Sequence, residues 1–462
     1  MDGEGRKEWP PHLARFLSLR ETEPALHAGA ACIFAGPIDT AALREVVALG
    51  AERYARFRQM PRGRLFPSYE EIDQIDVEPH VRTTRAAPPG GEAQLASAAS
   101  EIWSRRLDAR RPLWDVTLVE GLAENRSAVV LRLHRSLTDD GGALVAVREL
   151  LGPHGAADKP AKRALARRAR QGTALESLVG DLGTGAERAA ALGRELTNLL
   201  EPREALAQAR GFARQLEAAS TLVASPAPET PFNGVAGPAR RVGWVRLSRD
   251  ALAGIETALD ATRGEVLLTI VADALGRYLR ARGRTTVALE LMAIVRRGGT
   301  GAPGDEASGA LAPLPVDDQP PAERCAAIRT ALDDEHHRVR LADFDGLTSL
   351  CLTLPAPLRG IAVTLCHQAA NLLCVEIAGA APRVEVQHRA VRHVLPIAPL
   401  PWNLGLSIAC AASSSDEVAI GLNAAADLVP DLASFENALR SAYVEMAAAS
   451  GVPAIDPRRL TA

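Results

Sequence analysis

Two stretches with mixed strand and helix patterns flank one long stretch of helical composition, and this order limits the folds open to the chain. Up to about Leu151, short apolar runs such as ACIF alternate with amphipathic helix patterns. From Gly152 to Glu229 the composition shifts to Ala, Arg, Glu and Leu. Strand and helix patterns then resume with RRVGWVRL. The sequence therefore predicts two α/β domains, residues 1–152 and 230–462, joined by a basic helical connector, residues 153–229.

The composition is that of a globular protein with a near-neutral charge balance. The 462 residues are 47% hydrophobic, which is ample for two packed cores. There are 53 basic and 56 acidic side chains, so the net charge of -3 gives no reason to expect a nucleic acid as partner.

Cysteine spacing and hydropathy restrict the cellular setting. The six cysteines show no C-x-x-C spacing, so neither a disulfide framework nor a zinc site is expected, and no other metal site is indicated. The N-terminal MDGEGRKEWPPH lacks an apolar signal core. The most apolar long stretch, residues 360–381, is interrupted by polar residues that include His367 and Glu376. These features favour a cytoplasmic protein without a membrane-spanning segment.

The segment LRLHRSLTDDGGALVAVREL, residues 131–150, is the strongest candidate for a functional site. A β-hairpin is predicted from DVTLVEGL, a turn around ENRS, and AVVLRL, with His134 at the end of its second strand. A helix follows, with Asp139 and Asp140 near its N-terminus. Groups that leave the carboxyl end of a strand lie where ligands bind in α/β sheets. The alternative from the residues alone is a structural loop in which Arg135 pairs with Asp139 or Asp140.

The same region resembles a known enzyme family. LDARRPLWDVTLVEGL and LHRSLTDDGGAL are similar to the bacterial wax ester synthase / acyl-CoA:diacylglycerol acyltransferase (WS/DGAT) family, in which a PLW–EGL hairpin leads into HHxxxDG. Further similar segments are LHAGAACIF, TPFNG, LPVDDQPPAERCAAIR and VPDLASFENAL, so the resemblance covers nearly the whole chain.

The resemblance implies a fold and a reaction. The implied fold is the two-domain α/β fold of CoA-dependent acyltransferases, also called chloramphenicol acetyltransferase-like, with mixed sheets flanked by helices and an interdomain tunnel. The implied reaction transfers a long acyl chain from acyl-CoA to a fatty alcohol or diacylglycerol. It places the protein in lipid metabolism and triacylglycerol biosynthesis. Acyl-CoA is then a substrate, and no cofactor is expected.

The chain departs from the family motif at the position of the general base. Where the family has two histidines, this chain has His134 and Arg135. Asp139 keeps the aspartate position, whereas Asp140 stands where glycine is usual and precedes Gly141. A general base needs a pKa near the working pH, but arginine stays protonated beyond about pH 12. Arg135 therefore cannot act as that base, and the motif is degenerate.

Other positions that the resemblance assigns to the substrate tunnel are altered as well. An asparagine-aspartate pair of the family corresponds to Gly264 and Glu265. The NVPGP turn corresponds to the segment that begins at Glu376, and Ser407 replaces an asparagine in a late strand. We expect these four residues, together with Asp140 and Gly141, to lie along the tunnel.

Two functions are compatible with these departures. The first is an O-acyltransferase homologue with impaired or lost activity, and hence a pseudoenzyme. The alternative is a non-catalytic binder of lipid or acyl-CoA, or a partner subunit of an active homologue. Six basic side chains between Lys159 and Arg170 form either a solvated helix face or a surface that attaches peripherally to a membrane or lipid droplet.

Overall fold

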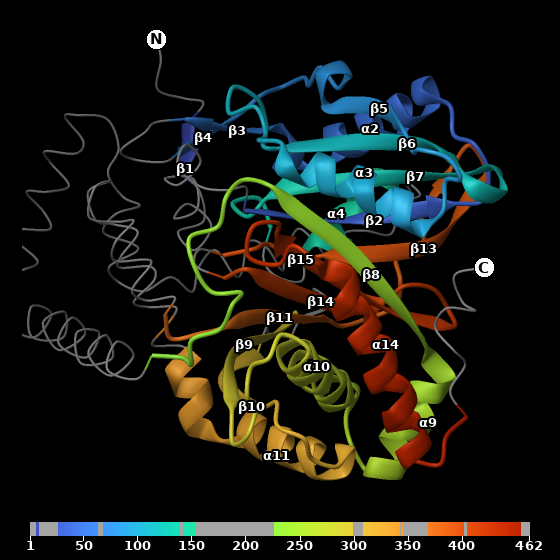
Figure 1. The fold of residues 1–462 in the computed structure, drawn as a ribbon. Helices are drawn as coiled ribbons and strands as arrows, with labels where there is room; N and C mark the ends of the chain where they lie inside the picture. The colour runs from blue at the N-terminus through green and yellow to red at the C-terminus, as the bar shows by residue number, and fades with distance from the viewer. Residues whose placement is uncertain are drawn as a thin grey trace, which may run out of the picture.

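The computed structural model describes residues 6–8, 26–62, 68–138, 142–152, 226–298, 308–341, 344, 368–401 and 404–453. Within these ranges the chain forms two six-stranded sheets, one above the other in Figure 1, and a small three-stranded sheet. The small sheet has the order β1 (Arg6–Glu8), β4 (Ser68–Glu71), β3 (Gln59–Arg62). Most of the expected connector, residues 153–225, lies outside the described residues.

The N-terminal sheet carries the predicted hairpin at its centre. Its order is β12 (Glu385–Val386), β13 (Arg389–Ile397), β2 (His27–Phe34), β7 (Arg126–His134), β6 (Trp114–Leu122), β5 (Val81–Arg85). All neighbours are antiparallel except β5 and β6. The α-helices of this half are α2 (Thr40–Arg53), α3 (Glu92–Ser104) and α4 (Gly142–Leu151). Short 3-10 helices are η1 (Ala55–Arg58), η2 (Glu78–His80) and η3 (Ala123–Asn125), the last at the hairpin turn.

The C-terminal sheet combines parallel and antiparallel pairing. Its order is β10 (Ser308–Pro315), β9 (Glu290–Gly298), β11 (Leu372–Ile377), β14 (Leu406–Ala412), β15 (Glu417–Ala425), β8 (Arg240–Ser248). The strands β9, β11 and β14 run parallel. The helices with described bounds that flank it are α9 (Arg249–Leu259), α10 (Arg263–Arg280), α11 (Pro321–Asp333) and α14 (Leu432–Ala449).

Helix α10 is the central helix of the C-terminal half, and its boundaries follow from its sequence. Thr262 is the N-cap, and its hydroxyl accepts from the backbone N–H of Glu265, whose carboxylate in turn accepts from the N–H of Thr262. After the last turn, Gly283 adopts a φ of 71°, a conformation that glycine tolerates best. Nearly every side chain between these ends is buried, because α10 lies between the sheet, α11 and α14.

The edge strand β8 joins the two halves. Its backbone N–H groups at Val242 and Arg240 donate to the hydroxyls of Ser100 (2.8 Å) and Ser104 (2.9 Å) on α3. One helical turn of four residues rises about 6.0 Å, close to the roughly 6.7 Å spanned by two strand residues. The spacing of the two serines along α3 therefore fits the spacing of every second N–H group along β8, and α3 covers this edge of the sheet.

Two strands of the N-terminal sheet, β12 and β13, come from the C-terminal part of the sequence. β13 pairs with β2, so that Val394 lies opposite Cys32. The loop after β13 returns the chain to β14 in the other sheet. The two halves are thus linked by a strand as well as by packing.

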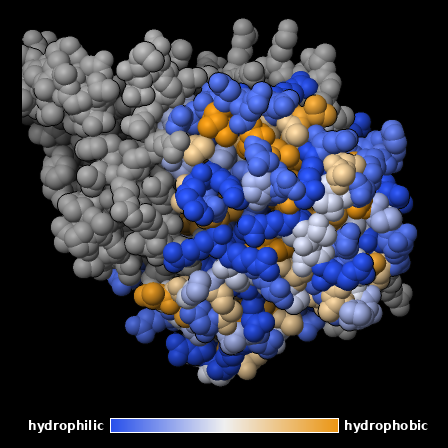
Figure 2. Space-filling view, turned by 90° about the horizontal axis from the view of Figure 1, so that it is seen from above, coloured by the Kyte–Doolittle hydropathy of each residue, from blue (hydrophilic) through white to orange (hydrophobic). Residues whose placement is uncertain are grey.

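The surface is mostly polar on the face seen from above. Figure 2 shows hydrophilic residues over much of its described part, with hydrophobic residues in small groups among them. Within the described ranges, no helix has both the length and the apolar content needed to cross a membrane.

Candidate active site

His134 is the last residue of β7 and lies where the hairpin leads into the loop before α4. Its side chain is buried, and it stands directly opposite His27 of β2. The backbone N–H of His134 donates to Leu113 O (2.9 Å), and that of Arg135 donates to Leu26 O (2.8 Å). Backbone bonds on both sides therefore fix the start of the loop. The predicted strand and helix are both present, with the loop between them.

The imidazole of His134 is oriented by Ser136. The backbone N–H of Ser136 lies 3.2 Å from Nδ1 of His134, and the Ser136 hydroxyl lies 2.9 Å from the same nitrogen. A backbone N–H can only donate, so Nδ1 accepts and Nε2 carries the hydrogen in the neutral ring. In this arrangement Nε2 is a donor, and it is not free to remove a proton from an alcohol.

The side chain of Arg135 is buried within the loop. Its Nη1 donates to the carbonyl oxygen of Thr138 at 3.2 Å. The other loop residues of the motif, Asp139, Asp140 and Gly141, lie outside the described residues. The pairing of Arg135 with one of these aspartates stays a prediction. Arg135 thus places a permanent cation within the motif, where the family has the second histidine.

A buried ion pair beside His134 was not predicted as part of the site. Arg132 donates to both carboxylate oxygens of Asp115, with 2.9 Å between Nε and Oδ1. Its Nη1 donates to the carbonyl oxygens of Ile102 and Arg105 at the end of α3, the latter at 2.7 Å. A cation at the C-terminal carbonyls of a helix is favourable. The only sequence signal was that strand alternation places Arg132 on the same face as His134.

The charge of Arg132 also acts on His27. Burial, followed by the nearby positive charges of Arg132 and Arg240, holds the pKa of His27 well below its ordinary value, with His134 contributing in the same direction. Nη1 of Arg132 lies 3.5 Å from Nδ1 of His27. Burial first, and these positive charges second, therefore disfavour the protonated form of His27.

A cavity of about 350 Å³ lies between α10, α11 and the C-terminal sheet. Three of the residues assigned to the tunnel, Gly264, Glu265 and Glu376, contribute to its wall. Its apolar wall is formed mainly by Leu267, Leu268, Val271, Val295, Leu332, Cys374, Val375, Ile408 and Cys410. An apolar pocket with a few polar groups is typical of sites for small amphipathic ligands.

Ion pairs hold the polar residues of this cavity in place. Nε of Arg297 lies 2.9 Å from Oε2 of Glu376, and Nε of Arg329 lies 3.0 Å from Oε2 of Glu265. The cavity also contains thiols. Burial raises the pKa of Cys374 to about 12, so this thiol stays protonated and weakly nucleophilic. The cavity thus offers a binding surface without a reactive nucleophile among these groups.

Ser407 lies apart from the residues that line the cavity. It is fully buried, and its hydroxyl donates to the carbonyl oxygens of Ala398 (3.4 Å) and Asn423 (3.5 Å). Ile408 and Cys410 face the cavity, and strand alternation directs Ser407 to the opposite face of β14. The structure therefore brings three of the four described tunnel candidates together and places the fourth elsewhere. Among the described residues, no group of His, Cys, Asp and Glu is arranged to hold a metal ion.

Two family models match consecutive parts of the chain. The wax ester synthase/diacylglycerol acyltransferase catalytic domain matches residues 11–267, and the WS/DGAT C-terminal domain matches residues 304–447. The chain belongs to the WS/DGAT family. A probable diacylglycerol O-acyltransferase of Mycobacterium tuberculosis is 25% identical over 469 residues, covering 96% of this chain and 97% of the relative. A putative diacylglycerol O-acyltransferase of Mycobacterium bovis is 27% identical over 395 residues, covering 76% and 75%.

Solved structures support the fold of this WS/DGAT family member. The wax ester synthase/diacylglycerol acyltransferase of Marinobacter aquaeolei has a TM-score of 0.65 and 20% identity, covering 95% of this chain and 98% of that structure. The first condensation domain of the CDA synthetase has a TM-score of 0.56 and 12% identity, covering 98% and 100%. The predicted two-domain fold of CoA-dependent acyltransferases is confirmed.

Proposed function

We propose that this WS/DGAT homologue binds a long-chain acyl-CoA, together with a fatty alcohol or diacylglycerol, but transfers the acyl group at a strongly reduced rate. The observation that carries the proposal is the buried guanidinium of Arg135 at the position of the family's general base. Two relatives are named as a probable and a putative diacylglycerol O-acyltransferase, which supports acyl-CoA and diacylglycerol as the substrate class.

The reaction needs a base that neither residue of the motif supplies in the observed arrangement. The acceptor hydroxyl oxygen must bond to the thioester carbon while the carbon–sulfur bond breaks, and the hydroxyl proton ends on the CoA thiolate. Arg135 is already protonated, and Nδ1 of His134 is engaged by Ser136. Loss of a positioned base typically removes roughly 10²–10⁴-fold of rate, so a trace remains through proximity alone.

The test is an acyl-transfer assay with purified protein, palmitoyl-CoA, and either hexadecanol or dioleoylglycerol, in which free CoA is measured. Wild type should release very little CoA, and Arg135→His should raise the rate. His134→Gln serves as the matched variant and should leave the wild-type rate unchanged. Wild-type turnover of about 1–10³ s⁻¹, lost in His134→Gln, would show that His134 is the base and that the protein is an ordinary enzyme.

The alternative is a non-catalytic lipid or acyl-CoA binder, or a partner subunit of an active homologue. Three cavity residues that differ from the family pattern, Gly264, Glu265 and Glu376, favour this alternative. The Arg297–Glu376 ion pair lies directly against Gly264. If Arg135→His binds palmitoyl-CoA but still transfers no acyl group, the site as a whole has lost its chemistry and this alternative holds.

A peripheral lipid interaction is a separate part of the proposal. The six basic residues between Lys159 and Arg170, outside the described residues, would attract anionic lipid by about 1 kcal/mol per charge near the surface. Weak, salt-sensitive binding to phosphatidylglycerol vesicles is expected. Replacing the six residues with glutamine should abolish it, and unchanged binding would contradict the assignment.

A further inference from the structure

The loop between α3 and β6 carries a dense group of arginines. The sequence RRLDARR, residues 105–111, contains four arginines and one acidic residue, and we refer to it as the arginine turn. The side chains of Arg110 and Arg111 are 89% and 40% exposed, so both can reach a ligand in solution. The turn therefore presents a net positive charge at the surface.

The arginine turn is organised by its acidic residue. Oδ1 of Asp108 accepts from the backbone N–H of Arg110 (3.0 Å) and from its Nε (3.2 Å), and Nε of Arg111 lies 3.6 Å from Oδ2. The N–H of Arg111 closes the turn by donating to Asp108 O at 3.1 Å. The hydrogen bonds from Arg110 hold the pKa of Asp108 below its ordinary value. One carboxylate thus orients two guanidinium groups and neutralises only one positive charge.

Buried contacts hold the turn next to the catalytic motif. Arg132 of β7 donates to the carbonyl oxygen of Arg105, where the turn begins. At its other end, Leu113 O accepts from the N–H of His134. The carbonyl oxygens of Arg105 and Leu113, at the start of the turn and just after it, thus both accept hydrogen bonds from residues at the end of β7.

A neighbouring strand is bonded to the residue before the turn. The backbone N–H of Arg240 at the start of β8 donates to the hydroxyl of Ser104 at 2.9 Å. The arginine turn is thus held by hydrogen bonds from both β7 and β8.

We propose that the arginine turn binds the phosphate groups of the nucleotide part of CoA. Guanidinium groups match the geometry of phosphate oxygens, and an ordered turn reduces the entropy lost on binding. The bonds of Arg105 O and Leu113 O to Arg132 and His134 place this phosphate site beside the end of β7. This inference rests on the proposed function, because it names where that acyl-CoA is held.

The test compares two thioesters that differ in their phosphates. Binding of palmitoyl-CoA and of S-palmitoyl-pantetheine, which has no phosphate, is measured by titration calorimetry at low and at physiological salt. Arg110→Gln/Arg111→Gln should weaken palmitoyl-CoA binding by about tenfold, or about 1.4 kcal/mol, and leave S-palmitoyl-pantetheine unchanged. The salt dependence of palmitoyl-CoA binding should fall as well. Arg249→Gln/Arg284→Gln removes two arginines from the C-terminal half and serves as the charge-matched control.

The outcomes separate this inference from the proposed function. If wild type binds palmitoyl-CoA and the turn variant binds it equally well, the arginine turn is not the phosphate site, whereas the proposed function stands. If the turn variant instead loses only its binding to phosphatidylglycerol vesicles, the phosphates recognised are those of lipid and the CoA assignment is overturned. Absence of palmitoyl-CoA binding in wild type would overturn both.

Discussion

Gly264 lies against the carboxylate of Glu376: a Cβ on residue 264 would stand 2.5 Å from Oε2 of Glu376 and 3.0 Å from Nη2 of Arg297. The ion pair between Glu376 and Arg297 thus occupies space that a glycine at the start of α10 leaves open. The family resemblance predicts asparagine at the positions of both Gly264 and Glu376. The two departures are therefore structurally coupled, since a larger residue at 264 would push against the glutamate.

The coupling can be measured with Gly264→Ala and Glu376→Ala, singly and together. Alanine gains up to about 1 kcal/mol over glycine in a helix. In wild type this gain should be offset by disruption of a partly exposed ion pair, worth about 0.2–1 kcal/mol. In the Glu376→Ala background Gly264→Ala should therefore be more stabilising. Urea denaturation of the four proteins gives the coupling energy, and equal effects of Gly264→Ala in both backgrounds would refute it.

The elements around the motif could be predicted because their signals are local. The hairpin ends in a recognisable turn at η3, the strand shows apolar residues up to Leu133, and α4 has helical spacing from Ala143 onwards. The position of β13 could not be predicted, since its pairing joins Val394 to Cys32 and no local pattern specifies a partner so far away in sequence.

The site could be predicted only in part, because local patterns do not show which residues far apart in sequence come together. Gly264 and Glu376 come together at one cavity because parallel strands and α10 bring their ends to one place. Ser407 was grouped with them from the family resemblance, yet it is on the opposite face of β14 from Ile408. The Arg132–Asp115 pair was missed because an arginine and an aspartate within strand patterns give no sign of burial.

Removal of Asp115 should strongly destabilise the protein. Asp115→Asn leaves the guanidinium of Arg132, only 2% exposed, without its carboxylate, which typically costs about 3–5 kcal/mol. Replacing both partners, Arg132→Met with Asp115→Leu, should cost less because no buried charge remains. Guanidinium chloride denaturation measures both effects. Glu124→Gln, which removes the more exposed pair with Arg126, is the control and should change the free energy of unfolding by less than about 1 kcal/mol.

Stability should fall as the pH drops through the range in which histidine titrates. The pKa of His27 is well below its ordinary value of 6.5 in the folded protein, so the unfolded chain binds the proton more readily. This contribution is fully present above pH 6.5 and is lost below it, by up to about 1.4 kcal/mol per pH unit. Burial lowers the pKa of His80 too, which adds a dependence of the same sign.

The pH dependence of His27 can be isolated by substitution. His27→Gln should reduce the slope of unfolding free energy against pH between about pH 7 and pH 5, while His80 maintains the remainder. His388, whose side chain is fully exposed, provides the matched control, and His388→Gln should leave the slope unchanged. A slope that is identical in wild type and His27→Gln would contradict the assignment.

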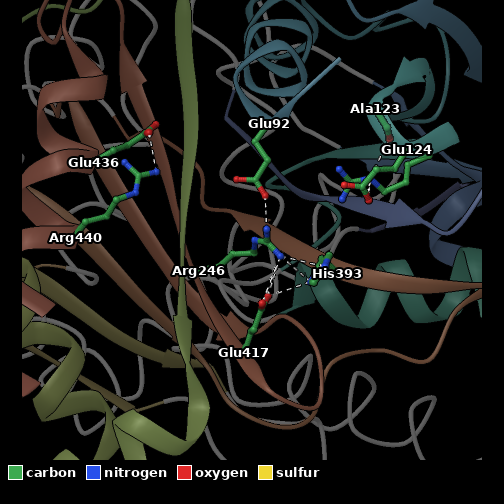
Figure 3. Close-up of polar contacts among 9 residues, drawn as sticks. Glu92, Ala123, Glu124, Arg246, His393, Glu417, Glu436 and Arg440 are labelled. Atoms are coloured by element: carbon green, nitrogen blue, oxygen red, sulfur yellow. Dashed lines mark hydrogen bonds and ion pairs between the residues drawn. The ribbon is translucent and has the colours of Figure 1, made fainter. Parts of the chain in front are cut away.

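An ion-pair network around Arg246 joins the two halves of the protein (Figure 3). Arg246 of β8, only 3% exposed, lies 2.6 Å from Glu92 of α3 and 3.1 Å from Glu417 of β15. His393 of β13 contacts both Arg246 and Glu417 at 3.1 Å. Burial opposes the charged form of Glu417, but the hydrogen bond from His393 and the charge of Arg246 outweigh it and lower the pKa of Glu417. One arginine thus holds together elements of both sheets.

Arg246→Met should therefore cost about 3–5 kcal/mol, because it leaves the buried carboxylate of Glu417 without its arginine partner. Since Glu92 is the contact to the N-terminal half, the variant should also lose cooperativity, with β8 and α3 separating before global unfolding. Hydrogen exchange at Val242, whose N–H donates to Ser100, reports this local opening. Arg440→Met removes the pair with Glu436, one turn apart within α14, and should cost less and leave exchange at Val242 unchanged, because both partners belong to one helix and bridge no other element. Equal destabilisation by Arg246→Met and Arg440→Met, with unchanged exchange at Val242, would show that the network does not couple the halves.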